Sequence, residues 1–209
     1  MSKGPVSKYV VELLGTFFLV LTIGTAAGLG HAGAMAPLAV GMVLIGLIYA
    51  GGPISRAHYN PAVTLAFWLR RDFDASDVMP YIGVQALGAG FAAALVRDVL
   101  ATAPMQATAL DAAPAWICEL LFTFVLCWVI LQVATNPKTA GNSYYGLAIG
   151  AVVCGAAFAV GPISGAVLNP AVAVGLAIMG PASWDALPLY FSAQLVAGVL
   201  AAVAYRLTD

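Results

Sequence analysis

The sequence predicts an all-α membrane protein with six transmembrane helices and two re-entrant half-helices, arranged as an inverted repeat of three spans plus three. Three observations carry this prediction. Apolar residues make up 62% of the 209 residues and charged residues only 8%, whereas soluble domains average about 25% charged residues. Six apolar runs are long enough to cross a bilayer. Two shorter runs each begin with the tripeptide Asn-Pro-Ala, at Asn60 and at Asn169.

The six long runs are the first elements to justify. A hydrocarbon core about 30 Å thick needs about 20 apolar residues in a helix. The first run follows two lysines and has no short apolar region with a cleavage site before it, so we expect an uncleaved span rather than a signal peptide. The six runs are Tyr9–Leu29, Ala34–Gly51, Val78–Leu100, Pro114–Ala134, Tyr144–Val160 and Ala186–Tyr205.

Two further apolar stretches, Pro61–Arg70 and Pro170–Met179, are too short to span. At 1.5 Å per residue each covers ~15 Å, half a bilayer. We expect half-helices over residues 61–71 and 170–180. Half-length helices at matching positions indicate the binding or conduction site of an inverted-repeat membrane protein.

The internal repeat extends well beyond these half-helices. The two Asn-Pro-Ala copies are 109 residues apart, and other matches include Glu12 with Glu119, Tyr81 with Tyr190, and Gln85 with Gln194. We therefore divide the single pore domain into a first repeat, residues 1–101, and a second, residues 113–209. Because each repeat has three spans, the two must have opposite orientations in the membrane.

The distribution of basic residues predicts the sidedness. A cytoplasmic N-terminus leaves only Arg97 on the outer side, and the positive-inside rule favours that arrangement. We expect a multi-pass protein of the plasma membrane or bacterial inner membrane with both termini in the cytoplasm. The residues on or near the cytoplasmic side are Lys3, Lys8, Arg56, Arg70, Arg71, Lys138 and Arg206.

The composition excludes several other classes of protein. A net charge of −1 gives no basic footprint, so no nucleic-acid partner is expected. The three cysteines lie inside apolar runs, which favours free thiols. The sequence has no nucleophile–base pair, metal-ligand cluster or phosphate-binding loop. We expect no enzyme activity, no metal site and no cofactor.

The paired tripeptides have a physical interpretation. Asn is a favoured N-cap and Pro a favoured first helical residue, so Asn60 should cap a helix beginning Pro61-Ala62, and Asn169 one beginning Pro170-Ala171. Short helices place both caps near the bilayer midplane. Two facing helix N-termini concentrate positive potential, which repels cations, and the Asn amides can donate to a passing oxygen. This predicts a pore for water or neutral hydroxyl-bearing solutes.

Nearly the whole chain resembles the aquaporin and aquaglyceroporin family, which implies a pore in every subunit of a homotetramer within the lipid bilayer. The resemblance implies that Glu12 and Glu119 accept backbone N–H bonds from the re-entrant loops, a role we favour over a proton relay. It also implies that His58 lines the cytoplasmic half of the pore. The matching residues are Glu12, the segment from Ile54 to Thr64, Gln85, Glu119, Ser164-Gly165 and Asn169-Pro170-Ala171.

The chain departs from this family at the narrow exterior filter. Its four positions correspond to Val40, Ala157, Ala166 and Val172. Water-selective members usually place a large aromatic residue, a His, a small residue and an Arg there, so we expect a wider and apolar constriction. The absence of the filter Arg resembles bacterial aquaporin-like channels linked to arsenic resistance, which pass neutral trivalent arsenicals, including methylated ones.

A second departure is Arg56, which stands at the cytoplasmic pore mouth where the family usually has Gly. It either adds positive charge to the pathway or pairs with Asp72 or Asp74, and we favour the pair. Two Gly-x-x-x-Gly pairs, at Gly24 and at Gly146, also predict close helix packing.

The sequence therefore predicts a passive channel for small neutral solutes: glycerol, urea and metalloid hydroxides such as arsenite or methylated arsenicals, with water permeability left open. One alternative is a water-selective channel whose filter is refilled by Phe158 or by the loop before Asn169. Others are an ion-coupled secondary carrier, for which Glu12 and Glu119 are the available titratable pair, and a non-conducting membrane junction protein.

Overall fold

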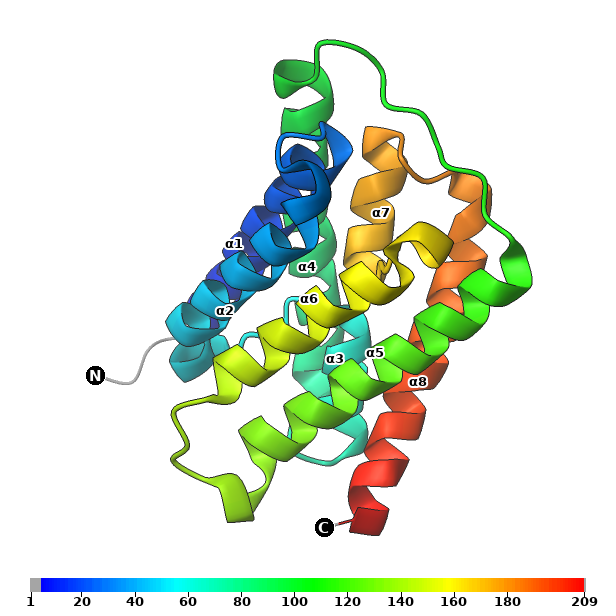
Figure 1. Ribbon diagram of the computed structural model, residues 1–209. Helices are drawn as coiled ribbons and strands as arrows, with labels where there is room; N and C mark the ends of the chain where they lie inside the picture. The colour runs from blue at the N-terminus through cyan, green and yellow to red at the C-terminus, as the bar shows by residue number, and fades with distance from the viewer. Residues whose placement is uncertain (1–4, 209) are drawn as a thin grey trace.

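The computed structural model describes residues 5–208, and these form helices and no strands (Figure 1). Six helices are long and apolar enough to cross a membrane, in agreement with the six predicted spans. The long helices are α1 (Pro5–Ile23), α2 (Ala36–Ser55), α4 (Ala75–Leu95), α5 (Ala112–Thr135), α6 (Tyr145–Ser164) and α8 (Leu187–Thr208). The π-helical turns η1 (Gly24–Gly28) and η3 (Val96–Leu100) extend α1 and α4. Short 3₁₀ turns are η2 (Gly33–Met35), η4 (Pro137–Thr139) and η5 (Trp184–Ala186).

The two half-helices are α3 (Pro61–Leu69) and α7 (Pro170–Met179). Both begin where the Asn-Pro pattern predicts, but the predicted ranges 61–71 and 170–180 run too far. The chain leaves α3 after Leu69, and Arg71 has a left-handed backbone with φ 68°. Gly180 ends α7 as a left-handed C-cap with φ 115°, a conformation that glycine adopts without steric cost.

The helices pack in pairs that follow the inverted repeat. α1 packs on α4 just as α5 packs on α8, and α2 packs on α6 across the two repeats. Each half-helix packs against the third span of the opposite repeat: α7 on α4, and α3 on α8. In Figure 1, α7 and α3 lie one above the other between the long helices. The half-helices are therefore held by contacts between repeats as well as within them.

Close helix packing occurs at glycines, including Gly150 of the second predicted pair, where a Cβ would lie 2.7 Å from the carbonyl oxygen of Gly41. A Cβ on Gly88 would lie 2.4 Å from the carbonyl of Leu13, and one on Gly198 would lie 2.7 Å from the carbonyl of Ala62. Gly24 instead faces side chains, as does Gly146. The Gly-x-x-x-Gly prediction is therefore wrong for Gly24, because spacing alone does not say which face meets a backbone.

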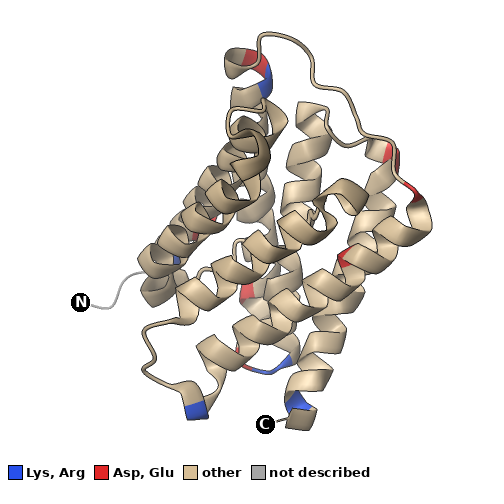
Figure 2. Cartoon of the chain, in the orientation of Figure 1, with Lys and Arg blue, Asp and Glu red and all other residues tan. Residues whose placement is uncertain are grey.

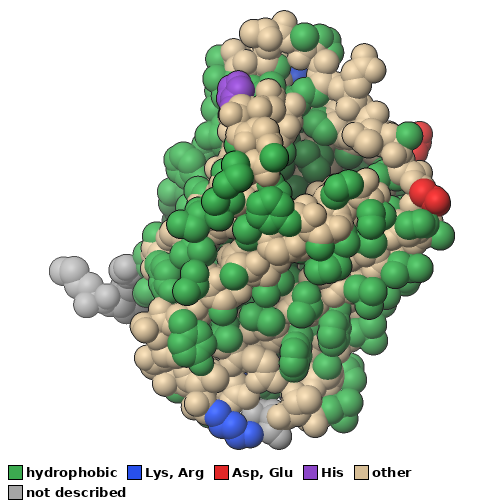
Figure 3. All heavy atoms as spheres, viewed as in Figure 1, with side chains coloured by type: hydrophobic (Ala, Val, Ile, Leu, Met, Phe, Trp, Pro, Cys, Tyr) green, Lys and Arg blue, Asp and Glu red, His purple; other side chains and the backbone are tan. Residues whose placement is uncertain are grey.

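The outer surface is suited to lipid. Large apolar side chains are exposed along the outer face of α1, including Val10, Leu14 and Phe18, and hydrophobic side chains cover much of the visible face in Figure 3. Lys and Arg gather toward one end of the bundle, and a basic and an acidic residue lie together at the far end of α4 (Figure 2). Lys3, which the sidedness prediction counts, lies outside the described residues.

Candidate channel site

The N-termini of α3 and α7 meet inside the bundle. The side-chain oxygen of Asn60 accepts from the N–H of Ala62 at 2.9 Å, and that of Asn169 accepts from the N–H of Ala171 at 2.9 Å. Both predicted N-caps are thus present. Each Asn also donates across the junction: Asn60 Nδ2 to the carbonyl of Leu168 at 2.9 Å, and Asn169 Nδ2 to that of Tyr59 at 2.8 Å. Because an amide carries two N–H groups, each Asn retains a second donor.

Two buried glutamates hold the loops that precede the half-helices. Glu12 is fully buried, and its carboxylate accepts from the backbone N–H of His58 at 2.9 Å and of Tyr59 at 2.7 Å. Glu119 is equally buried and accepts from Val167 at 2.8 Å and Leu168 at 2.7 Å. The contacts are the ones that the family resemblance implies for loop bracing.

Six further residues complete these two networks. Ser55 donates to Glu12 at 2.7 Å, as does Gln85 at 2.9 Å. The same bonds recur from Ser164 and Gln194 to Glu119, at 2.7 and 2.8 Å. Tyr81 and Tyr190 each donate to the carbonyl of the serine in their own network. The sequence displays the Tyr and Gln repeat but not the role, and it gives no signal for the serines beyond their repeated Gly-Pro-Ile-Ser context.

The braced loops share an unusual backbone conformation. Arg56, Ala57 and Tyr59 have φ angles of 69°, 52° and 48°. The equivalent residues of the second loop, Gly165, Ala166 and Leu168, have 85°, 47° and 52°. Non-glycine residues enter this left-handed region at a cost of roughly 1–2 kcal/mol each. In return, successive N–H groups converge on one concave point that suits an anion, and the glutamate carboxylates occupy it.

A cavity of about 890 Å³ runs along the inside of the bundle past both half-helix N-termini. Its walls are apolar rows spaced at four residues: Val40, Leu44, Ile48 and Gly52 on α2, and Ile149, Val153, Ala157 and Gly161 on α6. These two rows are repeat equivalents of each other. Asn60 and Asn169 supply polar atoms to the same cavity, so solutes would meet an apolar wall and a short polar junction.

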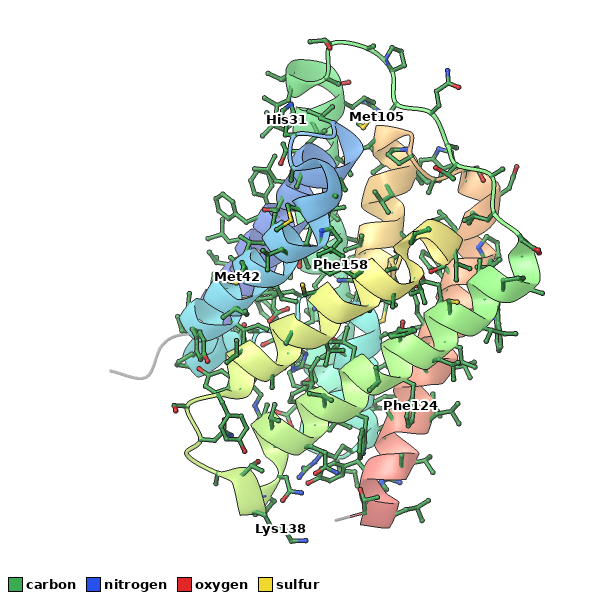
Figure 4. The ribbon with its side chains drawn as sticks, viewed as in Figure 1. His31, Met42, Met105, Phe124, Lys138 and Phe158 are labelled. Atoms are coloured by element: carbon green, nitrogen blue, oxygen red, sulfur yellow. The ribbon has the colours of Figure 1, made fainter. Side chains whose placement is uncertain are left out.

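All four predicted filter residues, Val40, Ala157, Ala166 and Val172, line this cavity. Val172 is 2% exposed and Val40 7%, so neither side chain points to the outer surface. Phe158, one proposed replacement for the missing filter side chains, is 53% exposed and labelled on α6 in Figure 4, and it does not line the cavity. One residue along a helix is a rotation of about 100°, which separates Phe158 from the row that contains Ala157.

The end of the cavity that contains Arg56 and Asp72 is charged. The Arg56 guanidinium donates to the Asp72 carboxylate at 2.7 Å and to the Asp72 carbonyl at 2.6 Å. The favoured pairing of Arg56 is therefore present, with Asp72 rather than Asp74. His58 also lines the cavity and is 3% exposed, with its Nδ1 3.2 Å from the hydroxyl of Thr64. The imidazole packs against Phe67, at 4.2 Å between ring centroids.

None of the three cysteines lines the cavity, and all three are free thiols. Cys154 lies where α6 packs on α2, since a Cβ on Gly41 would be 2.7 Å from the Cys154 Cβ. Cys127 is fully buried. No group of three or more His, Cys, Asp or Glu within residues 5–208 is placed to hold a metal ion.

Comparison with known proteins places this architecture in a family. A profile of the family described as Major intrinsic protein matches residues 2–205. The "Aquaporin AqpM" of Methanothermobacter thermautotrophicus is 33% identical over 95% of this chain and 96% of its own length. The "Glycerol uptake facilitator protein-like 6" of Lactiplantibacillus plantarum is 36% identical over 95% of this chain and 96% of its own length. The fold matches that of the aquaglyceroporin from Plasmodium falciparum with a TM-score of 0.75 at 23% identity, over 96% of this chain and 93% of that one. The chain therefore belongs to the Major intrinsic protein family, whose members are passive membrane channels for water or small solutes rather than enzymes.

Proposed function

We propose that this protein is a passive channel whose preferred solutes are small, neutral and larger than water: glycerol and other polyols, urea, and metalloid hydroxides such as arsenite and its methylated forms. One observation carries the proposal. The cavity residues at the filter positions are Val40, Ala157, Ala166 and Val172, so neither an aromatic ring nor a guanidinium comes from any of these four positions to narrow the filter. Each methylene buried against such a wall contributes about 0.8 kcal/mol, which favours solutes with apolar surface over water.

In this proposal the half-helix junction rejects ions. Without a filter arginine, cation exclusion depends on the positive ends of α3 and α7 and on the free amide N–H groups of Asn60 and Asn169. The roles of Glu12 and Glu119 are to brace the loops. Each carboxylate accepts four hydrogen bonds, which occupies the sites that a transported proton would use and argues against an ion-coupled carrier.

The proposal extends to assembly and sidedness. Residues 1–101 and 113–209 form the two inverted repeats of one pore domain, and the subunit assembles as a homotetramer with a pore in each copy. Both termini lie in the cytoplasm of a plasma membrane or bacterial inner membrane. The gathering of Lys and Arg residues toward one end of the bundle supports this orientation (Figure 2).

Stopped-flow swelling of proteoliposomes tests the cargo directly. Vesicles that contain the protein should pass glycerol, urea and arsenite well above empty vesicles, with flux that rises linearly with the solute gradient. Passage of water together with exclusion of glycerol and arsenite would overturn the wide-filter proposal. Flux that requires a proton or sodium gradient would favour the carrier.

A further inference from the structure

Arg97 and Arg206 contact the same point on the two half-helices. Arg97, in the turn η3 after α4, donates from Nη1 to the carbonyl of Ile178 at 3.3 Å. Arg206, near the end of α8, donates from Nη2 to the carbonyl of Leu69. Both the two arginines and the two carbonyls are separated by 109 residues, the interval between Asn60 and Asn169. One contact is therefore present in both repeats.

Each contact also joins one repeat to the other. Arg97 belongs to the first repeat and reaches α7 of the second, while Arg206 belongs to the second and reaches α3 of the first. The underlying helices pack in the same crossed pattern, α4 on α7 and α8 on α3. The arginines thus add a hydrogen bond within each packed pair, near the C-terminus of the half-helix.

These two hydrogen bonds are made to carbonyl groups at helix C-termini. The last carbonyls of a helix have no partner within it and carry the negative end of the helix dipole. Leu69 and Ile178 supply such carbonyls at the ends of α3 and α7. Isolated helices of about this length are not stable in water, so contacts at both ends determine where they lie. The Asn–carbonyl exchange holds the inner ends.

We propose that Arg97 and Arg206 are positioning residues that cap the C-termini of α7 and α3. They hold each half-helix at the depth that presents Asn169 and Asn60 to the channel. The proposal explains why Arg97 is the single exception to the predicted sidedness: its repeat equivalent is on the cytoplasmic side, and the inverted symmetry carries the contact to the other. Asp98 holds the guanidinium through bonds to Nε at 2.6 Å and Nη2 at 2.9 Å, which leaves Nη1 for Ile178.

Hydrogen–deuterium exchange of the full-length protein tests the crossed pattern. Arg97→Gln should speed exchange in residues 170–180 and leave 61–71 unchanged, and Arg206→Gln should do the reverse. The expected increase is about two- to fivefold, the size of a charge effect at a helix C-terminus. Lys138→Gln, which removes an exposed charge from the turn η4 and not from a helix that bonds the end of α3 or α7, is the matched control. Exchange that is unchanged in both half-helices, or that rises equally in both, would overturn the proposal.

Rescue by lysine separates positioning from general stability. Arg97→Lys and Arg206→Lys keep a charged donor, so they should restore most of the slow exchange that the Gln variants lose. If lysine behaves like glutamine, the contact is only packing and the proposal fails. Should Arg97→Gln not fold, Asp98→Asn replaces it: faster exchange confined to α7 supports the proposal, and unchanged exchange contradicts it. Exchange is measured without solute, so an error in the proposed cargo leaves this test intact.

Discussion

Asn60 and Asn169 hold each other's loops in place. Each caps its own half-helix with its side-chain oxygen and donates its amide to the carbonyl of the residue just before the other Asn, at 2.9 Å to Leu168 and 2.8 Å to Tyr59. The two half-helices are therefore joined by two hydrogen bonds between residues that line the cavity. These two bonds fix the inner ends of the half-helices relative to each other, which accounts for a junction of fixed position, while the C-terminal end of each half-helix depends on its own contacts.

This exchange predicts the effect of Asn60→Asp. The carboxylate still caps α3 but replaces the donor that faces the Leu168 carbonyl with an acceptor, and it places a negative charge between two positive helix ends. We expect a loss of about 1–3 kcal/mol in stability and a measurable proton or sodium leak in dye-loaded vesicles. Asn60→Ser, which can cap without charge, is the control. A leak as large in Asn60→Ser would assign the effect to loosened packing instead of charge.

Val172→Arg should narrow the filter. Val172 is almost fully buried and lines the cavity, so an arginine there fills space and adds hydrogen-bond donors. Glycerol and arsenite flux should fall at least about tenfold, a rise of ~1.4 kcal/mol in the barrier, while water flux is retained. Val172→Met adds length without charge and should have a smaller effect. Unchanged glycerol flux in the Arg variant would mean that Val172 does not face the constriction.

Glu12→Gln and Glu119→Gln should destabilise the protein to a similar extent. Glutamine offers one acceptor oxygen in place of two and turns an N–H group toward backbone donors, so each variant leaves buried polar groups unpaired. The expected cost is about 2–5 kcal/mol, seen as a lower unfolding temperature in detergent. A variant that stays stable but loses proton-dependent flux would instead indicate a carrier.

These networks show where sequence reasoning succeeds and where it stops. The Asn-Pro caps are local, because each cap bonds a residue two positions along the chain, so the pattern predicts them. The partners of Glu12 are remote: Ser55 is 43 residues away and Gln85 is 73. The repeat marked Gln85 and Gln194 as equivalent positions, but only the fold brings them to the carboxylates.

The left-handed loops could not be predicted for a different reason. Arg56, Ala57 and Tyr59 are not residues that favour positive φ, and no turn signal marks them. Their conformation is imposed by tertiary contacts, because the N–H groups of His58 and Tyr59 must converge on Glu12. Local propensity is overridden there by a buried charge that needs donors.

Gly88→Ala should destabilise the packing of α4 on α1. A Cβ at this position would lie 2.4 Å from the backbone carbonyl of Leu13, so the helices must separate, at a cost of about 1–3 kcal/mol. Gly83→Ala in the same helix is the control, since nothing lies within 4 Å of its Cβ, and it should stabilise by about 0.5–1 kcal/mol. The unfolding temperatures of both variants check this prediction. Equal shifts of the unfolding temperature would contradict the close contact between Gly88 and Leu13.

Mercury should not block the wild-type channel. The cavity wall of α6 is formed by Val153 and Ala157, whereas Cys154, between them in sequence, packs against Gly41 of α2. A mercurial bound to that thiol would not enter the solute path, and Cys127 is fully buried. Val153→Cys adds a thiol one position before Cys154, on the channel wall, so mercuric chloride should then abolish most glycerol flux, and a thiol reductant should restore it. If wild-type flux is inhibited and Cys154→Ser relieves the inhibition, Cys154 faces the solute, and the rotation of α6 about its axis must differ from that described above.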